Sequence, residues 1–174
     1  FASDEERAAY EDALCAQVEA EGAALLKNDN AALPLASGAK VSLFGHGSVD
    51  LMYGGTGSGS VDTSKAPSFK QALESQGITV NETLWNLYSS DDMMKNYSRV
   101  TPAAISDTLE ANTQYAVNEA PWSKLSGAES SFAEYGDAAI VVLSRSGGEG
   151  ADLPSGENGT NDSWVSGQEG DGNY

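Results

Sequence analysis

The stretch AAIVVLSRSGGEGAD, residues 138–152, carries the clearest indication of the fold. Its first part is a continuous apolar run, which is typical of a strand buried on both faces of a parallel sheet. The run ends in a loop of glycines that surround a single carboxylate, Glu149. Glycine permits unusual dihedrals and a close approach of the main chain to a ligand. The stretch therefore predicts a buried strand that leads into a loop at a binding site.

The same succession of strand and glycine-rich loop occurs earlier in the chain. The segment KVSLFG, residues 40–45, is followed by a glycine-rich loop over residues 45–61, and ITV at residues 78–80 predicts a third, short strand. Apolar residues at helical spacing predict helices around these strands. We expect helices over residues 4–27, 67–76, 81–97, 102–116 and 123–136. This alternation predicts an α/β fold, a layered sandwich with a mainly parallel sheet flanked by helices.

Local signals predict how two of the helices begin. Ser3 and Glu6 have the spacing of a capping box, with Ser3 as N-cap and Glu6 reaching back to it. Pro67 is expected near the first helical position of its segment. Cys15 lies beside the apolar stripe of the first helix, and we expect a small buried side chain rather than a nucleophile.

Composition excludes several classes of function. The 174 residues carry a formal charge of −17, which disfavours nucleic acid and anionic membrane surfaces as partners. The single cysteine excludes a disulfide within the chain. No apolar run reaches the roughly eighteen residues of a transmembrane helix, and no signal peptide is visible. We expect a soluble protein, cytoplasmic or secreted, whose two ends have been trimmed.

The glycine-rich segment after residue 44 contains no complete phosphate-binding motif. GHGSVD, residues 45–50, follows a strand as a dinucleotide fingerprint does, but Asp50 replaces the third small residue. GGTGSGSVD, residues 54–62, lacks the P-loop lysine, and its neutral donors suit an uncharged polyol better. His46, the one histidine, is expected to be a loop residue with a satisfied hydrogen bond. We expect neither a metal nor a cofactor.

Glu149 is the candidate for chemistry. A general acid for glycoside cleavage has to hold a proton near neutral pH and reach the leaving oxygen, and a loop carboxylate that covers a pocket could do so. By residue type alone, a solvated loop glutamate is the more common case.

Four motifs then combine in order: EGAALLKNDNAALPL, KVSLFG, YGGTGSGSV and AAIVVLSRSGGEGAD. Together they resemble glycoside hydrolase family 3, the β-glucosidase and β-xylosidase type, over residues 21–152. The resemblance implies the first part of that family's second domain, an α/β sandwich. It assigns residues 1–38 to a helix and linker from a missing (β/α)8-type barrel domain and residues 39–174 to a truncated sandwich domain. A bacterial source is expected.

The resemblance also implies roles for individual residues. The family works by retention, with an aspartate nucleophile on the barrel and, in many members, a glutamate of the second domain as acid/base. The family pattern S-G-E-G-x-D matches GGEGAD here, so Glu149 inherits the acid/base role, and Thr56 and Ser58 fall where members place substrate-contacting side chains. Leu153 stands where an arginine is frequent, which puts an ion pair with Asp152 in doubt. No aspartate here lies in the nucleophile motif, so the chain alone is expected to be inactive.

Other functions stay open at this point. The α/β domain could bind a sugar without chemistry or serve as a structural partner of the barrel, and a Rossmann-type dehydrogenase is a more distant alternative. The expected partners are a carbohydrate substrate and the barrel domain of the same protein. An exposed sheet edge would also allow two copies to pair as a homodimer.

Overall fold

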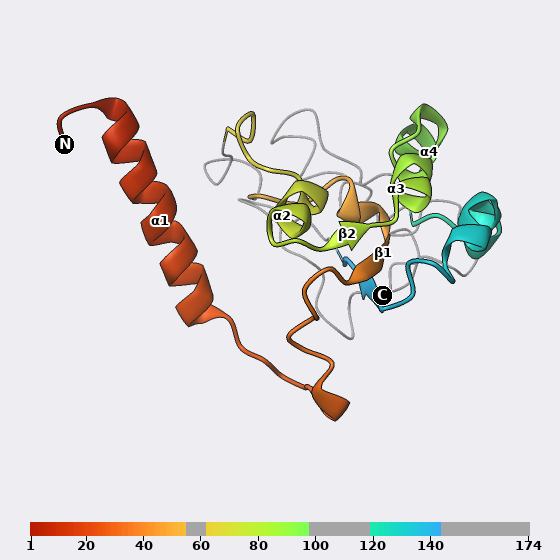
Figure 1. The fold of residues 1–174 in the computed structure, drawn as a ribbon. Helices are drawn as coiled ribbons and strands as arrows, with labels where there is room; N and C mark the ends of the chain where they lie inside the picture. Colours follow the sequence, from red (N-terminus) through yellow and green to blue (C-terminus); the bar gives the residue numbers. More distant parts are fainter. Residues whose placement is uncertain (55–61, 98–118, 144–174) are drawn as a thin grey trace, which may run out of the picture. The chain divides into compact units, whose positions relative to one another are not determined.

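The computed structural model of the chain describes residues 1–54, 62–97 and 119–143 (Figure 1). The chain forms two compact units, Phe1–Leu35 and Ala36–Tyr174. Among the helices of the three described ranges, none is long and apolar enough to cross a lipid bilayer.

The first unit consists mainly of the helix α1 (Asp4–Gly22). Ser3 is its N-cap, as predicted, because the Ser3 hydroxyl accepts a hydrogen bond from the Glu6 backbone N–H at 3.2 Å. The Glu6 carboxylate accepts from the backbone N–H of Ala2 rather than from that of Ser3, so the capping box forms only in part. The helix ends before the predicted Lys27, because glycine is a poor helix former and the next residue has an extended backbone.

The expectation that Cys15 is buried is wrong. No residue of α1 is buried, and Cys15 is an exposed free cysteine. The first unit, all of which the structure describes, adds to α1 only the short 3-10 helix η1 (Asp29–Ala31), so nothing within the unit covers the apolar stripe. The side-chain amide of Asn28 closes the turn around η1 by donating to Leu33 O at 2.8 Å and accepting from Leu33 N at 2.9 Å.

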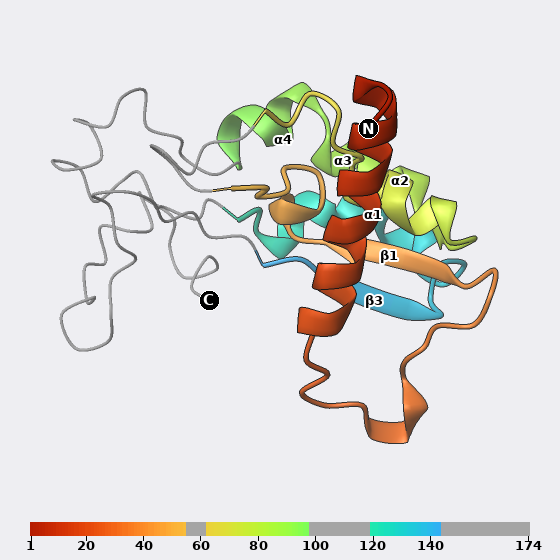
Figure 2. The same ribbon diagram turned by 90° about the vertical axis from the view of Figure 1, so that its left-hand side faces the viewer.

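The second unit is built on a parallel sheet. In the described ranges it has three strands, β1 (Lys40–Phe44), β2 (Thr79–Val80) and β3 (Ala138–Val141), in the order β2-β1-β3. Both pairs are parallel, with Val41 of β1 in register with Val80 of β2. Figure 2 shows β1 and β3 side by side. The parallel sheet with its helices confirms the predicted α/β fold.

The prediction that β3 is buried on both faces is wrong. Side-chain burial alternates along β3, and Val141 is 60% exposed. In β1, which has a neighbour on each side, Val41 and Leu43 are almost fully buried. An apolar run alone cannot distinguish a strand that is buried on both faces from one that is exposed on one face, because burial depends on the elements that lie over each face.

The remaining elements of this unit are short helices. They are the 3-10 helices η2 (His46–Ser48) and η5 (Trp122–Ser131) and the α-helices α2 (Phe69–Ser75), α3 (Glu82–Tyr88) and α4 (Asp91–Asn96). Ser68 and Gln71 form a complete capping box on α2, so Pro67 precedes the helix instead of beginning it. The helix predicted over residues 81–97 is two helices, because Ser90 caps α4 by accepting from Met93 N at 3.4 Å. The helix predicted over residues 102–116 lies outside the described residues.

The hydrophobic core lies where α3, α4 and η5 meet. Its buried members are Leu84, Tyr88, Met93, Ala120, Leu125 and Ala128, with Phe44 of β1 packed against them. Asn81, which is fully buried, joins the helices to the sheet. Its side-chain oxygen caps α3 by accepting from Leu84 N, and its side-chain nitrogen donates to the hydroxyls of Ser42 at 3.1 Å and Ser131 at 2.8 Å. This network fixes β1 against α3 and η5.

Candidate functional site

The carboxyl ends of β1 and β3 lie next to each other at one edge of the sheet. Phe44, the last residue of β1, is in register with Val141, the last residue of β3, and Val142 N donates to Phe44 O at 2.9 Å. Ligands of open α/β sheets bind beyond the carboxyl ends of the strands. This edge is therefore the candidate site.

Gly45 makes the close approach of the two strand ends possible. Its φ is +88° and its ψ 141°, a backbone conformation that side chains disfavour. A Cβ at this position would lie 2.7 Å from the backbone oxygen of Val142, well inside contact distance. Only glycine therefore fits between the end of β1 and the chain that leaves β3.

Tyr88 of α3 binds the backbone of Gly45. Its hydroxyl oxygen accepts a hydrogen bond from Gly45 N at 3.1 Å. Burial raises the pKa of Tyr88 to about 12, the charge of Glu119 acts in the same direction, and the hydrogen bond from Gly45 opposes them. Tyr88 is therefore uncharged at neutral pH, and its phenol serves the site as a hydrogen-bonding group rather than as a base.

His46 and Glu119 form a buried pair immediately beyond Gly45. The imidazole Nδ1 lies 3.0 Å from Glu119 Oε2, and the two residues are only 2% and 8% exposed. His46 N donates to the same carboxylate, at 2.9 Å to Oε2 and 3.1 Å to Oε1, and Ala120 N donates to Oε1 at 3.1 Å. One carboxylate thus holds the first turn after β1 and the start of the segment that leads into η5.

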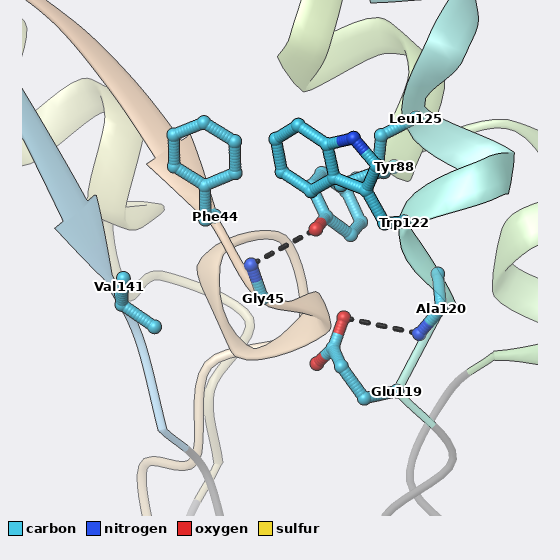
Figure 3. A pocket seen from close by; sticks show the side chains of 8 residues that line it. All are labelled: Phe44, Gly45, Tyr88, Glu119, Ala120, Trp122, Leu125 and Val141. Carbon is cyan, nitrogen blue, oxygen red and sulfur yellow. Dashed lines mark hydrogen bonds between the residues drawn. The ribbon is translucent and has the colours of Figure 1, made fainter. Parts of the chain in front are cut away.

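A pocket of about 340 Å³ opens at this edge. It is lined by Phe44, Gly45, Tyr88, Glu119, Ala120, Trp122, Leu125 and Val141 (Figure 3). The rings of Phe44 and Trp122 are stacked, with centroids 6.2 Å apart and planes at 19°. Ligand pockets are commonly apolar with a few placed polar groups. Here the Tyr88 hydroxyl and the Glu119 carboxylate are the polar groups among aromatic and aliphatic walls.

A comparison with protein families identifies the family of the chain. Residues 23–167 match the model of the glycosyl hydrolase family 3 C-terminal domain. The chain belongs to this family. It is also 32% identical over 141 residues to Beta-glucosidase A of Butyrivibrio fibrisolvens, an alignment that covers 80% of this chain. The chain spans only 15% of the length of that relative. No solved structure matches the chain.

The three residues predicted for this family 3 domain's site, Thr56, Ser58 and Glu149, lie outside the described residues. Their roles stay predictions. The described residues place the ends of the two strands that precede them, Phe44 and Val141, side by side. Within the described ranges, no group of three or more His, Cys, Asp or Glu side chains could hold a metal ion.

Sequence reasoning missed Glu119 and Tyr88 and described His46 only in part. His46 Nδ1 has the expected hydrogen bond, but the residue is buried and its Nε2 has no hydrogen-bond partner among the described residues. Glu119 stands 73 positions from His46, and Tyr88 stands 43 positions from Gly45. No local motif marks either residue, because a single Glu in a polar segment and a Tyr on an amphipathic helix are both ordinary.

Proposed function

We propose that the chain is the acid/base-bearing part of a retaining β-glycosidase. In this proposal Glu149 protonates the leaving oxygen and then activates water, and Thr56 and Ser58 contact the sugar. The nucleophilic aspartate is supplied by a barrel domain of the same protein, to which residues 1–38 connect. The chain alone is then inactive, because a retaining site needs two carboxyl groups about 5–5.5 Å apart.

The observation that carries the proposal is the pairing of β1 with β3 in a chain that belongs to family 3. Because the strands are parallel and adjacent, the chain leaves both at one edge, where the pocket opens. From β1 it continues toward Thr56 and Ser58, and from β3 toward Glu149. The name of the relative, Beta-glucosidase A, supports a β-linked substrate.

The test uses the full-length protein that contains this chain, assayed on aryl β-glycosides with good and poor leaving groups. We expect Glu149→Ala to keep a fast first turnover on the good leaving group and then to stall, because breakdown of the glycosyl-enzyme needs the base. Added azide should restore turnover and give a β-glycosyl azide. Poor leaving groups should lose activity at the first step, since they need the acid.

The matched control is Glu129→Ala, which removes an exposed glutamate of η5 and should leave all these rates unchanged. If Glu149→Ala hydrolyses both substrates like the wild type, Glu149 is an ordinary loop residue. The domain then has a binding or structural role.

A further inference from the structure

Glu119 and His46 connect two segments that are far apart in the sequence. The Glu119 carboxylate accepts from His46 N, from the imidazole Nδ1 and from Ala120 N, all within 3.1 Å. These donors lie in η2, directly after β1, and at the start of the chain leading into η5. The pair therefore determines the direction in which the chain leaves β1.

The chemistry of the pair assigns the imidazole proton. An ionised carboxylate can only accept hydrogen bonds, so Nδ1 carries a proton that points at Glu119. The remaining ring nitrogen, Nε2, is buried and has no hydrogen-bond partner within the described part of the chain. A buried polar atom without a partner opposes folding. Burying a carboxylate and an imidazole to close a turn costs desolvation free energy, which favours a role beyond stability.

The location of the pair at the edge of the pocket indicates what this role is. Glu119 lines the pocket beside Gly45, as Figure 3 shows. His46 follows Gly45 directly, and Gly45 is held by Tyr88 and packed against Val142 O. With the glycine fixed, the carboxylate of Glu119 sets the path of the next residues along the pocket edge.

We infer that Glu119 and His46 are positioning residues for glycoside hydrolysis. They act through the turn after β1, which they hold in the place where the sugar-binding side of the site needs it. The inference rests on the proposed function, because it assigns the pair to the same edge of the sheet. It predicts that loosening the turn impairs catalysis in molecules that remain folded.

The experiment compares Glu119→Ala, Glu119→Gln and the surface control Glu129→Ala in the full-length protein. Rates are expressed per active site, titrated by the first-turnover burst, at a temperature well below each unfolding midpoint. We expect Glu119→Ala to lower kcat/KM by about 10- to 100-fold, because small misplacements of positioning groups have effects of this size. Both kcat and KM should change, since the sugar and its transition state are held less well.

Glu119→Gln tests whether the loss of kcat/KM in Glu119→Ala comes from the loosened turn. At the place of Oε1, its amide oxygen can still accept from the backbone N–H groups of His46 and Ala120. The imidazole can shift its proton to Nε2, so that Nδ1 accepts from the amide nitrogen. We therefore expect kcat/KM to recover to within a few fold of the wild type. If Glu119→Ala only lowers the unfolding midpoint and keeps wild-type kcat and KM per active site, the pair is structural and the inference is overturned.

A second substitution covers the case in which Glu119→Ala does not fold. His46→Gln leaves the carboxylate and its backbone bonds in place and removes only the imidazole, and we expect a several-fold lower kcat/KM. Wild-type kinetic constants for this variant overturn the role of His46. Glu149→Ala is assayed in the same series. Its wild-type turnover would reject the proposed function, whereas a stalled Glu149→Ala beside an unimpaired Glu119→Ala rejects only the positioning role.

Discussion

Gly45→Ala tests whether the two strand ends are locked together as the structure indicates. The substitution forces a side chain into a backbone conformation near a region that only glycine readily adopts, which costs about 1–3 kcal/mol. Its Cβ would also meet Val142 O at 2.7 Å. To relieve this contact the backbone has to move, which weakens the bonds from Val142 N to Phe44 O and from Gly45 N to Tyr88. Each of these bonds contributes about 0.5–1.5 kcal/mol.

The expected loss in the free energy of unfolding is therefore roughly 2–5 kcal/mol. This is a large part of the about 5–15 kcal/mol that stabilises a typical domain. The assay is urea unfolding followed by tryptophan fluorescence, since Trp85 and Trp122 lie in the same unit as Gly45. With a slope of about 2 kcal/mol per molar urea, the midpoint should fall by roughly 1–2.5 M.

Substitutions at two other glycines separate the effect of the positive φ from the effect of the contact with Val142 O on the free energy of unfolding. Gly77 also has a positive φ, +76°, but no atom of the described residues lies within 4 Å of where its Cβ would be, so Gly77→Ala should lose only about 1–2 kcal/mol. Gly127 has similarly open space in the described structure and no positive φ, and Gly127→Ala should be neutral or slightly stabilising. If Gly45→Ala is no more destabilising than Gly77→Ala, the turn moves away from Val142 at little cost, and the argument for a fixed edge fails.

Two further substitutions test the supports of this edge. Asn81→Ala removes the cap of α3 and the bonds to Ser42 and Ser131, so the free energy of unfolding should fall by about 2–4 kcal/mol in urea unfolding; a loss under about 1 kcal/mol would contradict the network. Tyr88→Phe leaves the buried Gly45 N–H without its acceptor and should cost about 1–3 kcal/mol. Because the pKa of Tyr88 is raised to about 12 from an ordinary value near 10, its contribution to stability is complete below about pH 10 and is lost as the pH rises toward 12. Ultraviolet titration should show a late-ionising tyrosine that Tyr88→Phe removes, and an unchanged titration would contradict the burial.

The sequence was sufficient for the elements whose signals are local. The runs KVSLF and AAIV became β1 and β3, and the serine before Asp4 became the N-cap of α1. Ser90 followed by two aspartates is an equally local cap signal, and it explains the break between α3 and α4 that the helical periodicity hid. These features follow from the sequence because each depends only on interactions between residues that are close together along the chain.

Burial and the partners of the candidate site could not be predicted in this way. The exposure of Val141 depends on which elements lie over β3, and the exposure of Cys15 on what packs against α1. The pairing of His46 with Glu119 joins residues 73 positions apart. The sequence determined the family motifs and the parallel α/β character. Only the tertiary structure decided which carboxylate holds that turn, because contacts between distant residues form only when the chain folds around a common core.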